Sequence, residues 1–158
     1  MTAWRKPMRF VLVDRILELE AGKHIVAEKW ISPEEDYFPD HFPGYPVVPG
    51  VLLVEMMAQA AGKCLMAQID RTQWPVLLQI ARANFRRSVT PGSTVRIEAT
   101  IESCNKVTAS CQGYMTCEGT RVADCSLTMG FIAKDLLTAN FEDEVLRDYL
   151  ATKAAGPE

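Results

Sequence analysis

The chain has 158 residues, of which 48% are hydrophobic and 23% charged, and its formal net charge at pH 7 is −3. This length suits one domain, residues 1–158, that buries roughly two thirds of its unfolded surface, and the composition excludes disordered, collagen-like and coiled-coil proteins. The acidic balance argues against a nucleic-acid-binding protein, because such proteins usually need a basic excess to neutralise phosphates.

The first half of the chain contains strand-like segments followed by a stiff loop. Residues 8–13 form a short apolar segment entering the fold, which residues 16–20 can continue. Residues 1–7, which precede it, lack the apolar stretch of a signal peptide. A turn at residues 21–22 precedes a predicted strand over residues 23–31. Residues 32–49 include five prolines, which exclude a regular element and predict a rigid loop of the kind that often carries function.

A long helix is predicted over residues 51–69, which contain no proline and many Leu, Met and Ala residues. At 1.5 Å per residue it would be roughly 28 Å long. Glu55, Gln59 and Lys63 recur every four residues and form one narrow polar stripe, so the other faces must be covered by protein. A membrane span would accommodate these three side chains only at a heavy cost, and we expect a cytoplasmic protein.

The remainder of the chain is mostly strand-like. Residues 76–80 are a short apolar run, and residues 94–102 alternate so that Val95, Ile97, Ala99 and Ile101 share one face. Residues 106–117 and 121–131 flank a plausible hairpin turn at Glu118-Gly119. With two histidines and no Cys-x-x-Cys pair, a structural zinc site is not expected. Four cysteines are interpreted as small hydrophobes on strands: Cys104, Cys111, Cys117 and Cys125.

A terminal helix is predicted over residues 139–150, followed by a frayed end at residues 151–158. Its apolar side consists of Phe141, Val145, Leu146 and Tyr149. One long buried helix and about five or six antiparallel strands indicate an α+β architecture, with a core over about residues 8–132. The sheet must wrap around the long helix, because no other element is large enough to cover it.

Residues that could carry chemistry lie close together in the sequence. His41 belongs to the proline-rich loop, and Glu55 lies in the helix, where a buried carboxylate needs a partner or a task. Gln59 shares the face of Glu55 and could hold it. Gly50 lies at the helix N-terminus, whose free N–H groups could stabilise an enolate-like oxygen on a thioester carbonyl.

Each of these residues also has a purely structural interpretation. His41 could be a hydrogen-bonded or exposed loop residue, Glu55 could pair with Lys63, and Gly50 could serve only as a turn residue. Residue type and spacing alone leave both interpretations open.

Taken together, the motif resembles the β-hydroxyacyl-(acyl carrier protein) dehydratases of type II fatty-acid synthesis. The matching residues are His41-Phe-Pro-Gly-Tyr-Pro-Val-Val-Pro-Gly-Val-Leu52 and Glu55-Met-Met-Ala-Gln59, with flanks at residues 10–19 and 84–92. The resemblance covers roughly residues 8–132 and implies the hot-dog fold, in which an antiparallel sheet wraps around one long helix.

The resemblance also implies a mechanism that uses neither a metal nor an organic cofactor. His41 would abstract the α-proton of the substrate, Glu55 would protonate the departing β-hydroxyl, Gly50 would bind the thioester carbonyl, and Gln59 would orient Glu55. In such enzymes the two catalytic side chains come from different subunits, so we expect a homodimer or a trimer of dimers. The peptide bond between His41 and Phe42 can be cis, and members with Glu at the acid position generally only dehydrate.

Other residues bear on the substrate and the carrier protein. Asp40 stands where the family usually has glycine, and it either acts on His41 or points to solvent. Arg82, Arg86 and Arg87 form a basic cluster that suits docking of an acidic acyl carrier protein, or else a solvated strand face with neighbouring acids. Apolar residues near the motif could line an acyl tunnel or belong to the core: Phe38, Phe42, Val47, Val48, Leu52, Leu53 and Met56.

Two other functions remain open at this point. One is a hot-dog acyl thioesterase, against which the complete motif argues. The other is a non-catalytic subunit that binds acyl carrier protein, against which the retention of both His41 and Glu55 argues.

Overall fold

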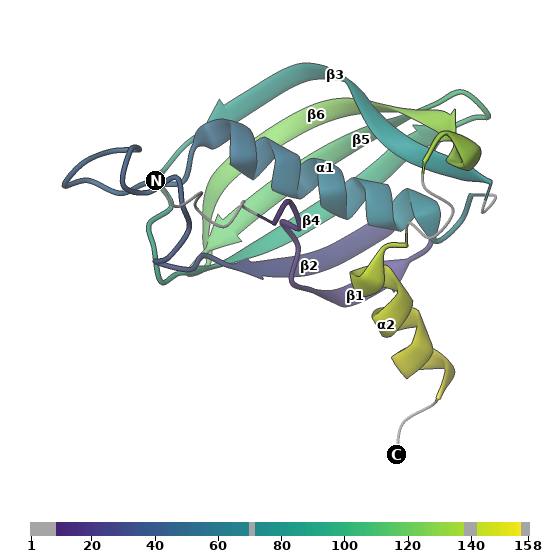
Figure 1. The fold of residues 1–158 in the computed structure, drawn as a ribbon. Helices are drawn as coiled ribbons and strands as arrows, with labels where there is room; N and C mark the ends of the chain where they lie inside the picture. Colours follow the sequence, from purple (N-terminus) through teal and green to yellow (C-terminus); the bar gives the residue numbers. More distant parts are fainter. Residues whose placement is uncertain (1–8, 70–71, 138–141, 156–158) are drawn as a thin grey trace, which may run out of the picture.

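In the computed structural model, which describes residues 9–69, 72–137 and 142–155, one long helix lies against the concave face of a curved antiparallel sheet (Figure 1). The strand order in the sheet is β1-β2-β4-β5-β6-β3. This is the α+β, hot-dog arrangement predicted from the sequence. The strands are β1 (Arg15–Glu20), β2 (His24–Trp30), β3 (Gln73–Phe85), β4 (Thr94–Cys104), β5 (Thr108–Cys117) and β6 (Thr120–Ala133). The helices are α1 (Gly50–Met66), α2 (Glu144–Ala154) and the short 3-10 helix η1 (Lys134–Leu136).

The central helix α1 begins one residue before the predicted start and ends three residues before the predicted end. Its first residue, Gly50, follows Pro49, whose missing N–H costs nothing at a helix N-terminus. At the other end, Gly22 of the β1–β2 turn donates its N–H to the carbonyl of Cys64 at 2.9 Å. This contact satisfies a carbonyl that has no partner within the helix, where the sequence itself carries no clear stop signal. Most of α1 is buried, as its apolar faces predict.

The alternation predicted for β4 is confirmed, because Val95, Ile97 and Ala99 are almost fully buried. The hairpin turn between β5 and β6 is also confirmed, since Glu118 and Gly119 both have positive φ, as a two-residue turn of this kind requires. Strand β3 is much longer than the predicted residues 76–80. The strand pairs with β6 along its whole length, from Gln73 to Phe85, and two register shifts accommodate its curvature.

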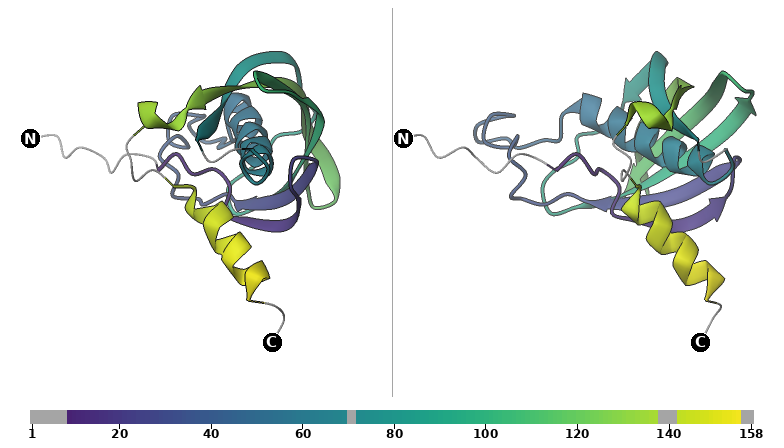
Figure 2. Two further views of the ribbon diagram at one scale, coloured as in Figure 1. Left: turned by 90° about the vertical axis from the view of Figure 1, so that its right-hand side faces the viewer. Right: turned by 45° about the vertical axis from the view of Figure 1, so that its right-hand side comes forward.

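The C-terminal helix α2 projects away from the sheet (Figure 2). The predicted residues 139–141, including Phe141, lie outside the described residues, and the helix continues to Ala154 instead of ending at residue 150. Asp143 caps it by accepting a hydrogen bond from the Leu146 N–H at 2.9 Å. Leu146 is buried, and Val145 and Tyr149 pack partly against the core, as predicted. None of the helices in the described ranges is long and apolar enough to cross a membrane.

The cysteines differ in burial, and this difference predicts their reactivity. Burial raises the pKa of the Cys64 thiol to about 11 and the pKa values of Cys111 and Cys125 to about 12. Cys104, interpreted from the sequence as a strand hydrophobe, ends β4 and is exposed, so that interpretation is wrong for this residue. Cys117 is half-buried.

At pH 8 we therefore expect a thiol-reactive dye to label Cys104 and Cys117 first in the folded protein. The thiolate is the reactive form, and a pKa three or more units above the pH leaves at most about one buried thiol in a thousand ionised. Mass spectrometry after timed labelling identifies the modified residues, and denaturant should expose all five. Early labelling of Cys111 or Cys125 would contradict the burial described here.

Candidate functional site

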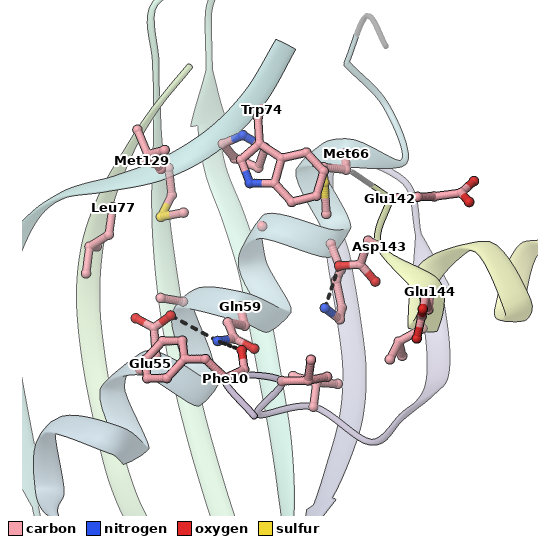
Figure 3. Close-up of a pocket in the computed structure, with 18 of the residues that line it drawn as sticks. Phe10, Glu55, Gln59, Met66, Trp74, Leu77, Met129, Glu142, Asp143 and Glu144 are labelled. Atoms are coloured by element: carbon pink, nitrogen blue, oxygen red, sulfur yellow. Dashed lines mark hydrogen bonds and ion pairs between the residues drawn. The ribbon is translucent and has the colours of Figure 1, made fainter. Parts of the chain in front are cut away.

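The carboxylate of Glu55 lies in a pocket beside α1 with a volume of about 970 Å³ (Figure 3). One face of α1 forms its floor, and the N-terminal arm (residues 9–14) and the first part of β3 form its sides. The start of α2 lies at the end of the pocket away from Glu55. The floor residues are Glu55, Ala58, Gln59, Gly62, Lys63 and Met66.

Gln59 holds Glu55 in place through one hydrogen bond and is itself fixed by the N-terminal arm. Its side-chain amide donates to Glu55 Oε1 at 3.0 Å and to the carbonyl of Phe10 at 3.2 Å. Its side-chain oxygen accepts the Leu12 N–H at 2.9 Å, which fixes the orientation of the amide because a backbone N–H can only donate. Glu55 therefore faces the pocket with one oxygen held by a neutral donor.

The alternative pairing of Glu55 with Lys63 does not occur. The ammonium group of Lys63 contacts Asp143 Oδ2 at 2.6 Å instead. Since Lys63 is engaged by another carboxylate, no cation holds Glu55 within the part of the chain that the structure describes.

His41 lies in a tight turn of the proline-rich loop, and its ring orientation is set by the backbone. Nδ1 lies 3.0 Å from the carbonyl oxygen of Val47. Because that oxygen can only accept, Nδ1 carries the hydrogen and the neutral ring has its lone pair on Nε2. The Phe42 ring stacks on the imidazole at a centroid distance of 4.0 Å, and the peptide bond between the two residues is cis. Asp40 is exposed, and no ion pair joins it to His41 among the described residues.

Gly50 provides a helix N-terminus without a side-chain cap. Pro49 makes no capping hydrogen bond, and the first turn of α1 contains no acidic residue. In the described structure the N–H groups of Gly50 and Val51 have no hydrogen-bond partner, so they can receive an anionic oxygen. A Cβ atom at position 50 would lie 3.1 Å from the ring of Phe85, so glycine permits this close approach of strand β3.

The structure brings Gln59 to Glu55 within one chain, but it does not bring His41 into the same pocket: the residues that line the Glu55 pocket do not include His41 or Gly50. The residues proposed for the acyl tunnel also lie outside this lining. Phe38, Val47, Val48, Leu53 and Met56 are buried in the core, Leu52 is half-buried and Phe42 is exposed.

The walls of the pocket were not identified from the sequence. They come from residues 9–14, from Trp74 to Leu77 and from the start of α2, which are far apart in the chain. One local signal was available: Ala58 and Gly62 follow Glu55 on the same helical face and leave space above it.

The three arginines of the basic cluster have different surroundings. Arg86 contacts the buried carboxylate of Asp124 at 2.7 Å, and Asn84 donates to the same carboxylate at 2.9 Å. The hydrogen bond from Asn84, followed by the contact with Arg86, lowers the pKa of Asp124. Arg82 and Arg87 are exposed and have no charged partner within the described ranges. They remain available for an acidic partner, whereas Arg86 has a neighbouring acid.

Comparison with known proteins gives consistent matches. The profile of the FabA-like domain matches residues 5–126. A 3-hydroxyacyl-acyl-carrier-protein dehydratase FabZ of Desulforamulus reducens is 47% identical over 93 residues, which cover 58% of this chain and 66% of the relative. The dehydratase of the same name from Oenococcus oeni is 37% identical over 132 residues, covering 82% of this chain and 91% of the relative.

Solved structures with low sequence identity share the fold. The dehydratase heterocomplex ApeI:P from Xenorhabdus doucetiae contains a chain with 17% identity and a TM-score of 0.58, covering 72% of this chain and 92% of that one. A putative thioesterase from Ralstonia eutropha JMP134 has 20% identity and a TM-score of 0.61, covering 73% of this chain and 82% of that one. At these identities the likeness concerns the fold alone, and it confirms the predicted architecture.

Proposed function

This chain belongs to the FabA-like family, and on that premise we propose that it removes water from 3-hydroxyacyl thioesters of acyl carrier protein. The product is a trans-2-enoyl thioester, formed in fatty-acid or related acyl-chain biosynthesis in the cytoplasm. The observation that carries the proposal is the setting of Glu55. Its carboxyl group lies in a pocket large enough for an acyl chain, and the amide of Gln59 holds one of its two oxygens.

His41 acts as the base in this proposal. With Nδ1–H directed at the Val47 carbonyl, Nε2 is the atom that can accept the α-proton of the substrate. As the Cα–H bond breaks, negative charge moves onto the thioester oxygen. The N–H of Gly50 stabilises that oxygen at the positive end of α1.

Glu55 acts as the acid. It gives its proton to the β-hydroxyl, the Cβ–O bond breaks, water leaves and the Cα–Cβ double bond forms. His41 is then protonated and Glu55 ionised, and a proton passes from one to the other through solvent before the next turnover. Gln59 acts as a positioning residue, because its amide holds one oxygen of Glu55 and leaves the other to the substrate.

A second copy of the chain completes the site in this proposal. His41 is absent from the lining of the Glu55 pocket, so the base facing Glu55 comes from a partner subunit. Strand β3 is one of the two edge strands of the sheet, and it carries exposed apolar side chains, among them Leu78 (60% exposed) and Ile80 (49% exposed). A long apolar edge of this kind needs a cover, which supports a homodimer or a trimer of dimers.

Acyl carrier protein is the proposed donor of the substrate. Arg82 and Arg87 supply exposed positive charge on and just after β3 in an otherwise acidic chain, and such charge speeds the docking of an acidic partner.

The proposed reaction is tested in reverse with a crotonyl thioester, by following the loss of enoyl absorbance as water is added. We expect hydration without release of free thiol. Release of thiol would indicate a thioesterase, and binding of acyl carrier protein without turnover would indicate a non-catalytic subunit; either result contradicts the proposal.

A further inference from the structure

A buried ion pair lines the end of the pocket away from Glu55. Lys63 is only 5% exposed, and its ammonium group lies 2.6 Å from Asp143 Oδ2. The other carboxylate oxygen of Asp143 accepts the Leu146 N–H and caps α2. The Asp143 side chain therefore joins the start of α2 to the central helix. A second link, between Arg9 and Glu144 at 3.0 Å, ties the N-terminal arm to the same turn.

A smaller hollow of about 340 Å³ lies beyond this point. Its lining and that of the Glu55 pocket share four residues: Met66, Trp74, Glu142 and Asp143. The start of α2 therefore separates two hollows that follow one another along the same side of α1.

We propose that Lys63 and Asp143, with the first turn of α2, form an end wall that limits the length of the acyl chain. This inference rests on the proposed function, because it assumes that the chain extends from the reacting carbons along the floor of the Glu55 pocket. A desolvated ion pair holds its position strongly, since separating the two charges would leave each of them buried and unpaired. An alkyl chain that reaches the wall cannot displace it.

The spacing of the floor residues gives the expected limit. Glu55 and Lys63 are eight residues apart on α1, which corresponds to about 12 Å along the helix axis. Carbon–carbon bonds of about 1.5 Å advance an extended alkyl chain by about 1.3 Å each, so about nine bonds fit in this distance. Counted from the β-carbon near Glu55, this predicts efficient turnover up to about twelve carbons.

Gly62 offers an independent way to shorten the available space. It lies on the floor between Glu55 and Lys63, and a Cβ atom built there would meet only Pro75 Cγ, at an ordinary contact distance of 3.6 Å. A methyl group therefore fits without displacing the backbone, and it occupies volume that the acyl chain would use.

The first test compares kcat/KM for six-carbon and sixteen-carbon 3-hydroxyacyl thioesters in the full-length double variant Lys63→Met/Asp143→Ser. Methionine replaces the lysine stem without charge, and serine keeps the helix cap but is shorter than aspartate. We expect the sixteen-carbon to six-carbon ratio to rise by about tenfold or more over the unmodified chain, since one methylene in an apolar pocket changes specificity by about 10- to 200-fold. The control, Asp148→Ser/Lys153→Met, makes the same exchanges on the exposed surface of α2 and should leave the ratio unchanged.

The second test uses Gly62→Ala, which should keep or raise the stability of the protein while it lowers the turnover of the longer substrate. Alanine is preferred over glycine inside a helix, so Tm should stay the same or rise. The ratio of twelve-carbon to six-carbon turnover should fall by about tenfold. Unchanged chain-length profiles in both variants, with six-carbon turnover intact, would overturn the end wall and leave the dehydratase proposal standing. Absence of turnover at every chain length in the unmodified protein would overturn the dehydratase proposal and the end wall with it.

Discussion

Replacement of Glu55 by glutamine is expected to lower kcat/KM for a 3-hydroxyacyl thioester by about 10²- to 10⁴-fold, the usual contribution of a general acid. Glutamine keeps the shape of the side chain and can still accept the hydrogen bond from Gln59, but it has no acidic proton for the departing hydroxyl. His41→Ala should cause a loss of the same order, because it removes the proposed proton acceptor. Initial rates at saturating and limiting substrate measure both effects.

Matched substitutions elsewhere separate chemistry from folding. Glu102→Gln changes an exposed carboxylate on β4, and His24→Ala removes the other histidine of the chain, on β2. Both control variants should retain nearly full activity. The double variant His41→Ala/Glu55→Gln should be little slower than either single variant, because groups that act in one step lose their effects together. Near-normal activity of Glu55→Gln would remove Glu55 from the mechanism.

Mixing the two inactive variants is expected to restore activity. If each site combines His41 of one subunit with Glu55 of the other, a heterodimer of His41→Ala and Glu55→Gln chains contains one intact site and one doubly altered site. Random assembly at equal concentrations makes about half of the dimers heterodimers, so activity should reach about one quarter of the unmodified value. The variants are mixed under conditions that allow subunits to exchange, and activity is followed until it is constant.

The same experiment distinguishes a site built within one chain. In that case every site of a heterodimer would lack one of the two residues, and mixing would restore nothing. Each variant carried through the exchange alone serves as the control and should remain inactive. Activity that stays at this background, although mass spectrometry shows that heterodimers have formed, would contradict the shared site.

The local elements of this fold could be predicted because their causes are local. Five prolines exclude regular structure from residues 32–49, and the alternation over residues 94–102 separates buried from exposed side chains. The two residues of the turn at Glu118-Gly119 adopt the positive φ that its hairpin requires. The contact between Glu55 and Gln59 could also be predicted, since a spacing of four residues on a helix brings two side chains together. The end of α1 and the length of β3 were misjudged, because the β1–β2 turn and pairing with β6 set them.

Contacts between distant parts of the chain could not be predicted in this way. Lys63 pairs with Asp143, 80 residues away, and the amide of Gln59 is oriented by backbone groups of Phe10 and Leu12. Local periodicity describes which face of an element is apolar, but it carries no information about which other element covers that face. The chain's own pattern therefore specified a buried helix with an acidic side chain near its start. The folding of the arm, β3 and α2 around that helix produced the pocket and its far wall.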